Sequence, residues 1–64
     1  MNKKPTFDEL ISMSKEKAKQ ADAIYNKDPN KAIDLLLEGS NYLLKASRIA
    51  LEKLKEKYEK ISND

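Results

Sequence analysis

Residues 34–51 read DLLLEGSNYLLKASRIAL, and this stretch decides how the chain can fold. The composition favours a helix, but consecutive residues of an α-helix lie about 100° apart around its axis. Leu35, Leu36 and Leu37 therefore point in three directions, and Leu43 and Leu44 repeat the pattern one heptad later. Such a helix carries more apolar surface than one neighbouring helix can cover.

The excess can be expressed as an angle. With Leu36 as the origin, the apolar arc of this stretch spans roughly 240°, whereas a surface helix needs an apolar stripe only a little wider than ~100°. We expect the middle of the arc to face the rest of the chain and its edges to contact another protein, because large exposed apolar patches mark interaction sites. The predicted partner-binding residues are Leu37, Leu44, Leu51, Tyr58 and Ile61 on one edge, and Leu35, Tyr42 and Ile49 on the other.

Sequence signals place two helices around this stretch. Residues 6–9, TFDE, match a capping box in which Thr6 caps a first helix and Glu9 returns to its amide. Small residues in the middle of this helix would let a second helix approach closely. Its predicted apolar stripe is Phe7, Leu10, Ile11, Ala18, Ala21, Ile24 and Tyr25, and its small residues are Ser14, Ala18 and Ala21.

The first helix should stop at residues 26–30, NKDPN. Asp28 is a favourable N-cap, and Pro29 suits the first helical position because it needs no hydrogen-bond acceptor there. Since the connection is short, we predict an all-α fold, an antiparallel two-helix hairpin over residues 6–62 after a flexible N-terminus over residues 1–5. The second helix runs from Pro29 toward Ser62.

Gly39 is the one weak point of the second helix, because an interior glycine costs about 1 kcal/mol relative to alanine. A break there would give a three-helix bundle that buries many of the leucines internally. We prefer one long helix, because the apolar register continues across the glycine without a slip. In that case the first helix, of about 21 residues, reaches only to about residue 50. The C-terminal part would then overhang with a narrow apolar stripe typical of a coiled-coil seam.

Composition limits the function. The 64 residues form one small domain of a size that is marginally stable alone. The sequence has no cysteine and no histidine, which excludes disulfides, thiolate sites and the commonest general base. No serine has a base to activate it, so we expect neither an enzyme nor a cofactor or metal site. Thirteen basic and eleven acidic residues make a mixed surface, for which we predict no sequence-specific nucleic-acid binding.

Localisation follows from what the chain lacks. Its longest apolar run is Leu35–Leu37, too short for a membrane span, and MNKKPTF at the N-terminus has no apolar core of a secretion signal. We therefore expect a cytoplasmic protein. The composition, rich in Lys and Glu and free of cysteine, is also typical of thermophiles.

Three family resemblances point to interaction modules. KAIDLLLEGSNYLLKA, residues 31–46, resembles the second helix of MIT domains, which implies a three-helix module that holds peptide tails. Phe7, Ala32-Ile33, Leu36 and Gly39 are similar in layout to the exodeoxyribonuclease VII small subunit, a non-catalytic hairpin on a large nuclease. The overall size and lysine-rich composition resemble the small helical accessory subunits of crenarchaeal family-B DNA polymerases, which implies an archaeal replication protein.

These observations give one principal hypothesis and two alternatives. We expect a non-catalytic accessory subunit that docks through apolar helix faces onto a larger enzyme and stabilises the assembly. The last two resemblances imply that this enzyme processes DNA, with the catalytic subunit of a DNA polymerase as the expected partner. The alternatives are a homodimeric four-helix bundle, formed when the chain is isolated, and an MIT-like receptor for helical peptides.

Overall fold

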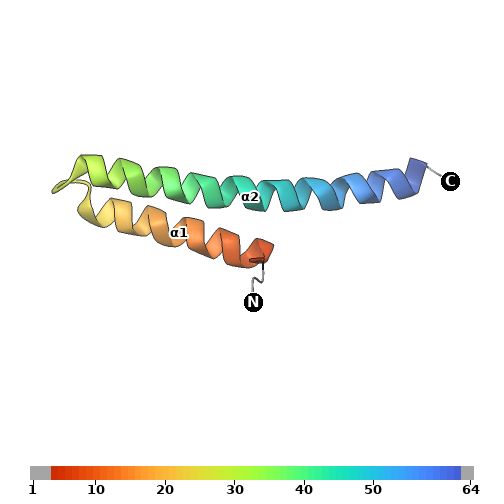
Figure 1. The fold of residues 1–64 in the computed structure, drawn as a ribbon, viewed down its shortest axis with the longest axis horizontal. Coiled ribbons are helices and arrows are strands. Elements are labelled where there is room, and N and C mark those ends of the chain that lie inside the picture. Colours follow the sequence, from red (N-terminus) through yellow and green to blue (C-terminus); the bar gives the residue numbers. More distant parts are fainter. Residues whose placement is uncertain (1–3, 63–64) are drawn as a thin grey trace.

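Two antiparallel helices make up the fold (Figure 1). The computed structural model describes residues 4–62, with α1 over Phe7–Ile24 and α2 over Pro29–Ser62. No strand occurs within these residues. The predicted all-α hairpin with a long second helix is therefore confirmed. Of the predicted flexible N-terminus, residues 1–3 lie outside the described part, and residues 4 and 5 are exposed and outside any helix.

Both helix starts form as their sequences predict. The amide of Thr6 donates to Glu9 Oε1 at 2.8 Å, and the amide of Glu9 donates to Thr6 Oγ1 at 3.2 Å, so the capping box is complete. At the second start, Asp28 Oδ1 accepts from the amide of Lys31 at 3.1 Å. These contacts satisfy amides that have no partner inside their helix.

The connection between the helices is compact. The amides of Lys27 and Asp28 both donate to the carbonyl of Ile24, at 3.0 and 2.8 Å. Because the chain turns here, α1 has 18 residues, somewhat fewer than expected, and Tyr25 caps it instead of continuing its stripe.

α2 is continuous through Gly39 for 34 residues, and Gly39 has no positive φ. The alternative of a three-helix bundle broken at Gly39 is wrong, because the glycine keeps helical geometry and no turn interrupts the apolar register. The fold implied by the MIT resemblance is wrong for the same reason, since no third helix exists among residues 4–62.

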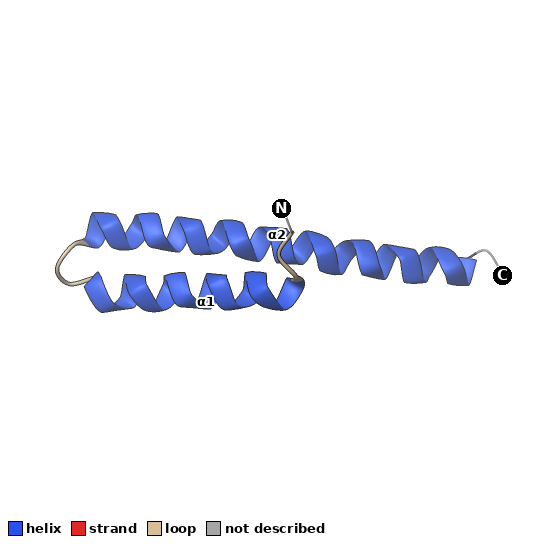
Figure 2. Cartoon of the chain, turned by 60° about the horizontal axis from the view of Figure 1, so that its bottom comes forward, coloured by secondary structure: helices blue, strands red, loops and turns tan. Residues whose placement is uncertain are grey.

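The hairpin is a single flat layer with a long overhang (Figure 2). Its Cα atoms extend over 57 × 28 × 13 Å, and the radius of gyration is 16.0 Å. A compact domain of this length would have a radius of gyration of about 11 Å. Residues 6–8, at the start of α1, lie beside residues 49–53, so α1 extends along α2 to about residue 50 as the sequence predicted, and residues 51–60 are all exposed. Domains normally bury apolar faces between two layers, and only one is present here.

Candidate protein-interaction surface

One face of α2 packs against α1, and we call it the inner strip. Its residues recur at alternating spacings of three and four, the pattern of an antiparallel coiled coil. Every seventh residue is small and buried, and the residues between them are large and half-buried. The small members are Ala32, Gly39 and Ala46, and the large members are Leu35, Tyr42 and Ile49.

α1 presents a matching stripe with the same spacing. Leu10 and Ala21 are 2% exposed, and Ser14, Lys17 and Ile24 are half-buried. The two backbones come close at Gly39, where a Cβ atom would lie 3.2 Å from the carbonyl oxygen of Ser14 and 3.3 Å from Lys17 Cβ. The predicted close approach at small residues thus occurs at Ser14 and Ala21. At Ala18 it does not, because Ala18 is exposed.

The position of the inner strip corrects part of the sequence analysis. We expected the middle of the arc, around Leu36 and Leu43, to face α1, but these residues are 47% and 49% exposed. α1 lies instead on the small-residue side, where close approach of the backbones gives many contacts for little side-chain volume. Three residues assigned to a partner, Leu35, Tyr42 and Ile49, consequently lie half-buried against α1 within the hairpin.

A second apolar face runs along the other side of α2, and we call it the outer seam. By helical arithmetic its centre lies roughly 130° around the axis from the inner strip. All eight members are large, and their exposed fractions range from 47% to 69%. They are Ile33, Leu36, Leu37, Leu43, Leu44, Leu51, Leu54 and Tyr58.

The outer seam contains four of the residues predicted to bind a partner, Leu37, Leu44, Leu51 and Tyr58. It also contains Ile33, Leu36, Leu43 and Leu54, which the sequence analysis missed as surface residues. The side chain of Ile61, also predicted, lies outside the described residues. The sequence does contain a pattern that indicates which face is covered. Small residues recur every seven positions at Ala32, Gly39 and Ala46, so a neighbouring helix can pack closely on that side and the other side stays exposed.

The two faces end at different places along α2. After Ile49 the inner positions become charged, at Lys53, Glu56 and Lys60. This change occurs beyond the N-terminal end of α1, which begins at Phe7. The outer seam continues with Leu51, Leu54 and Tyr58 over the same stretch. The overhang therefore retains an apolar face on the side directed away from α1.

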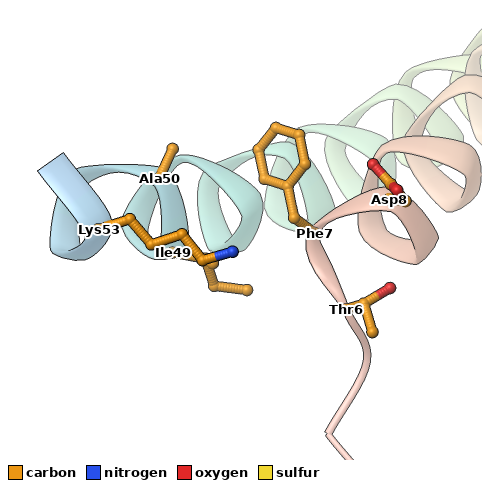
Figure 3. Close-up of a pocket in the computed structure, with 6 residues that line it drawn as sticks. All are labelled: Thr6, Phe7, Asp8, Ile49, Ala50 and Lys53. Carbon is orange, nitrogen blue, oxygen red and sulfur yellow. The ribbon is translucent and has the colours of Figure 1, made fainter.

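A hollow of ≈ 430 Å³ marks the end of the α1–α2 contact (Figure 3). In this view the Phe7 ring and Ala50 project to one side of α2, and Thr6 and Ile49 lie on the other. Phe7 is 38% exposed, so the ring closes the end of the hairpin only in part. No polar side chain among the described residues is buried, so the hollow offers no built site for a small polar ligand.

Polar contacts between the helices are sparse. Lys17 Nζ lies 3.5 Å from Glu38 Oε2 at the margin of the inner strip. Both side chains are partly solvated, so this ion pair adds little stability. Within residues 4–62, no three acidic side chains gather as a candidate metal site. Neither helix, over the residues described, is long and apolar enough to cross a membrane. The surface with functional potential is therefore the outer seam.

Comparison of the chain with protein-family models, with curated proteins and with solved structures yields no match. The three resemblances noted in the sequence thus stay predictions, and function has to be argued from the surface itself.

Proposed function

We propose that this chain is a non-catalytic interaction module, an accessory subunit that docks through its outer seam onto a larger protein and stabilises the assembly. The observation that carries the proposal is the unequal length of the two apolar faces of α2. α1 accounts for the inner strip, which ends at Ile49, whereas the large side chains of the outer seam are about half exposed or more and continue past that point through Leu51 and Leu54.

Surface area supports the same proposal. The chain exposes 5900 Å², whereas a compact monomer of 7.3 kDa would expose about 4,200 Å². The excess, about 1,700 Å² by that relation, is more than one partner contributes to a standard protein–protein interface. The eight large apolar side chains of the outer seam are 47–69% exposed, and patches of this kind are characteristic of interaction sites.

The spacing of the outer seam indicates that the partner surface is helical. Leu37, Leu44, Leu51 and Tyr58 are seven residues apart, as coiled-coil positions are. Tyr58 suits the rim of such a contact, because its ring is apolar and its hydroxyl can stay hydrated. A helix of the larger protein lying along this row would supply the second layer that the hairpin lacks.

The resemblance to accessory subunits of crenarchaeal family-B DNA polymerases determines which partner to test first. We accordingly propose the catalytic subunit of such a polymerase as the larger protein. This part of the proposal rests on the sequence resemblance, whereas docking through the outer seam rests on the exposed leucines.

The experiment combines the tagged chain with the purified polymerase subunit at moderate salt with nuclease present, and measures co-elution by size-exclusion chromatography. We expect the wild type to bind, and Leu44→Asp to lose binding while circular dichroism shows that its helices remain. Lys45→Asp is the matched control, because it introduces the same side chain at the next residue, which is exposed and lies about 100° around α2 from Leu44, outside the outer seam. Loss of the fold in Leu44→Asp would instead identify Leu44 as a core residue of the hairpin.

The same chain used as bait in a native extract tests docking without assuming the polymerase. Retention of one large protein in near-equal amount by the wild type and by Lys45→Asp, but not by Leu44→Asp, is the expected result. If the wild type retains no larger protein from the extract and does not bind the polymerase subunit, the accessory role is wrong.

A further inference from the structure

The outer seam has a register in which it complements itself. Two rows with seven-residue spacing run along its centre: one consists of its members Leu37, Leu44, Leu51 and Tyr58, and the other joins its member Leu54 to the exposed serines Ser40 and Ser47. The first row is large throughout, whereas the second begins with two serines. A close-packed interface requires each large residue to meet a small one or a gap that it fills.

We propose that the free chain pairs with a second copy of itself, with the two α2 helices antiparallel and seam residue i of one opposite seam residue 91 − i of the other. Residues that flank the seam then pair with an offset of two residues from this register. Leu44 then faces Ser47 of the second copy, and Leu51 faces its Ser40. Because a two-fold interface is isologous, each such pair occurs twice. In a parallel pair, Ser40 and Ser47 would each meet their own copies, which leaves the seam underpacked.

Helix length supports this register independently. α2 begins at Pro29 and ends at Ser62, so the register that aligns the two helices end to end also pairs residue i with residue 91 − i. If one helix slides by one heptad in one direction, Tyr58 lies opposite residues that precede the start of the other copy's α2 at Pro29. A shift in the opposite direction brings Arg48 against Arg48, a like-charge pair.

Charge also favours this register. On one flank of the seam lie Asp34, Asn41, Arg48 and Lys55, acidic near the start of α2 and basic near its end. In the antiparallel pair, Asp34 meets Lys55 of the second copy, and Asn41 meets its Arg48. Residues that flank a coiled-coil seam set the orientation of its helices, and here opposite charges meet only when the helices run antiparallel.

The other flank is apolar over its first two heptads. Leu43 meets Ala50 of the second copy, and Leu36 meets the aliphatic stem of its Lys57. The overhang of each copy thus covers the part of α2 near the turn of the other, where Ile33 and Leu36 are about half exposed. The two α2 helices then form the centre of the dimer, and each α1 packs on the side of its own α2 away from the seam.

The exposed area is sufficient for such a dimer. Each chain exposes about 1,700 Å² more than a compact monomer of its mass would, about twice the ~800 Å² that one partner contributes to a standard interface. This inference rests on the proposed function in one respect, because the same seam serves both contacts. A larger protein that docks there must displace the second copy, so self-pairing and docking compete.

Cross-linking tests the register directly, because the natural sequence has no cysteine. Ser40→Cys and Leu51→Cys chains are mixed under reducing conditions, equilibrated and mildly oxidised, and the products are identified by mass. We expect the mixed Ser40→Cys/Leu51→Cys product to predominate. Ser40→Cys alone should give little product, because the two thiols would lie roughly 16 Å apart along the axis. Predominant linking of Ser40→Cys to itself would indicate a parallel pair and overturn the proposal.

Charge exchange tests the flank. Asp34→Lys and Lys55→Asp are each expected to weaken the dimer roughly tenfold, measured as its dissociation constant by sedimentation equilibrium, because two attractive pairs become repulsive. The double variant should recover most of the wild-type affinity. Glu56→Lys is the matched control, because it makes the same change in charge at an exposed position about 160° around α2 from the centre of the seam. Equal weakening by Glu56→Lys would contradict the register.

The outcome for the wild type separates this inference from the proposed function. The mass of the wild-type chain in solution is measured at about 100 μM, because the stability of a dimer depends on concentration. A species of twice the 7.3 kDa chain mass supports self-pairing, and a monomer at this concentration contradicts it. A monomeric wild type that still binds the polymerase subunit would overturn self-pairing alone. A dimer that binds no larger protein would overturn the accessory role alone.

Discussion

The inner strip and the outer seam lie on the same helix, and they differ in the size of their residues. The inner strip has a glycine or alanine at every seventh position, and α1 lies so close that a Cβ atom at Gly39 would come within 3.2 Å of the Ser14 carbonyl oxygen. The outer seam has leucines at comparable positions, and they are about half exposed. The face with small residues at every seventh position therefore packs against α1, and the face with leucines at comparable positions stays exposed and available for another chain.

The largest effect should follow from removing the one large side chain that is fully buried between the helices. Leu10 is 2% exposed, so Leu10→Ala should destabilise the hairpin by about 2–5 kcal/mol, enough to unfold so small a chain. Leu44→Ala on the outer seam should cost less than about 0.5 kcal/mol at a concentration at which the monomer predominates. Urea unfolding followed by circular dichroism measures both. Comparable losses would mean that the two faces are equally buried.

A smaller effect is expected from enlarging the inner strip. Ala46 is fully buried, and Ala46→Leu would separate the helices at a cost of about 1–3 kcal/mol. Ser47→Leu is the matched control, because it adds a leucine at the next residue, which is exposed. The same unfolding measurement should show no comparable loss for Ser47→Leu in the monomer. A stabilising Ala46→Leu would show that the helices are not close-packed there.

The smallest effect is expected at Gly39, where two contributions oppose each other. Alanine is favoured over glycine in a helix by about 1 kcal/mol. Its Cβ, however, would lie 3.2 Å from the Ser14 carbonyl oxygen and 3.3 Å from Lys17 Cβ, which are backbone-fixed atoms that must shift. At a concentration at which the monomer predominates, we expect Gly39→Ala to change stability by less than about 0.5 kcal/mol, whereas Ser40→Ala, at an exposed position, should gain a few tenths. A full gain of about 1 kcal/mol in thermal denaturation would contradict the close approach.

Features set by neighbouring residues could be predicted from the sequence. The capping box of Thr6 and Glu9, the N-cap at Asp28 and the start of α2 at Pro29 depend on groups within three or four residues of one another. The continuity of α2 through Gly39 followed from the unbroken apolar register. The overhang followed from helix lengths, because the rise per residue of a helix is constant.

The sequence by itself determined that α2 carries more apolar surface than α1 can cover, because angles around a helix depend only on residue number. Only the tertiary structure decided which part of that surface α1 covers. That choice depends on how closely two backbones can approach, and closeness requires small residues on both helices at matching heights: Ser14 opposite Gly39 on the two inner faces. The leucines at 36 and 43 were left outside because a helix packed against them would stand farther away and make fewer contacts.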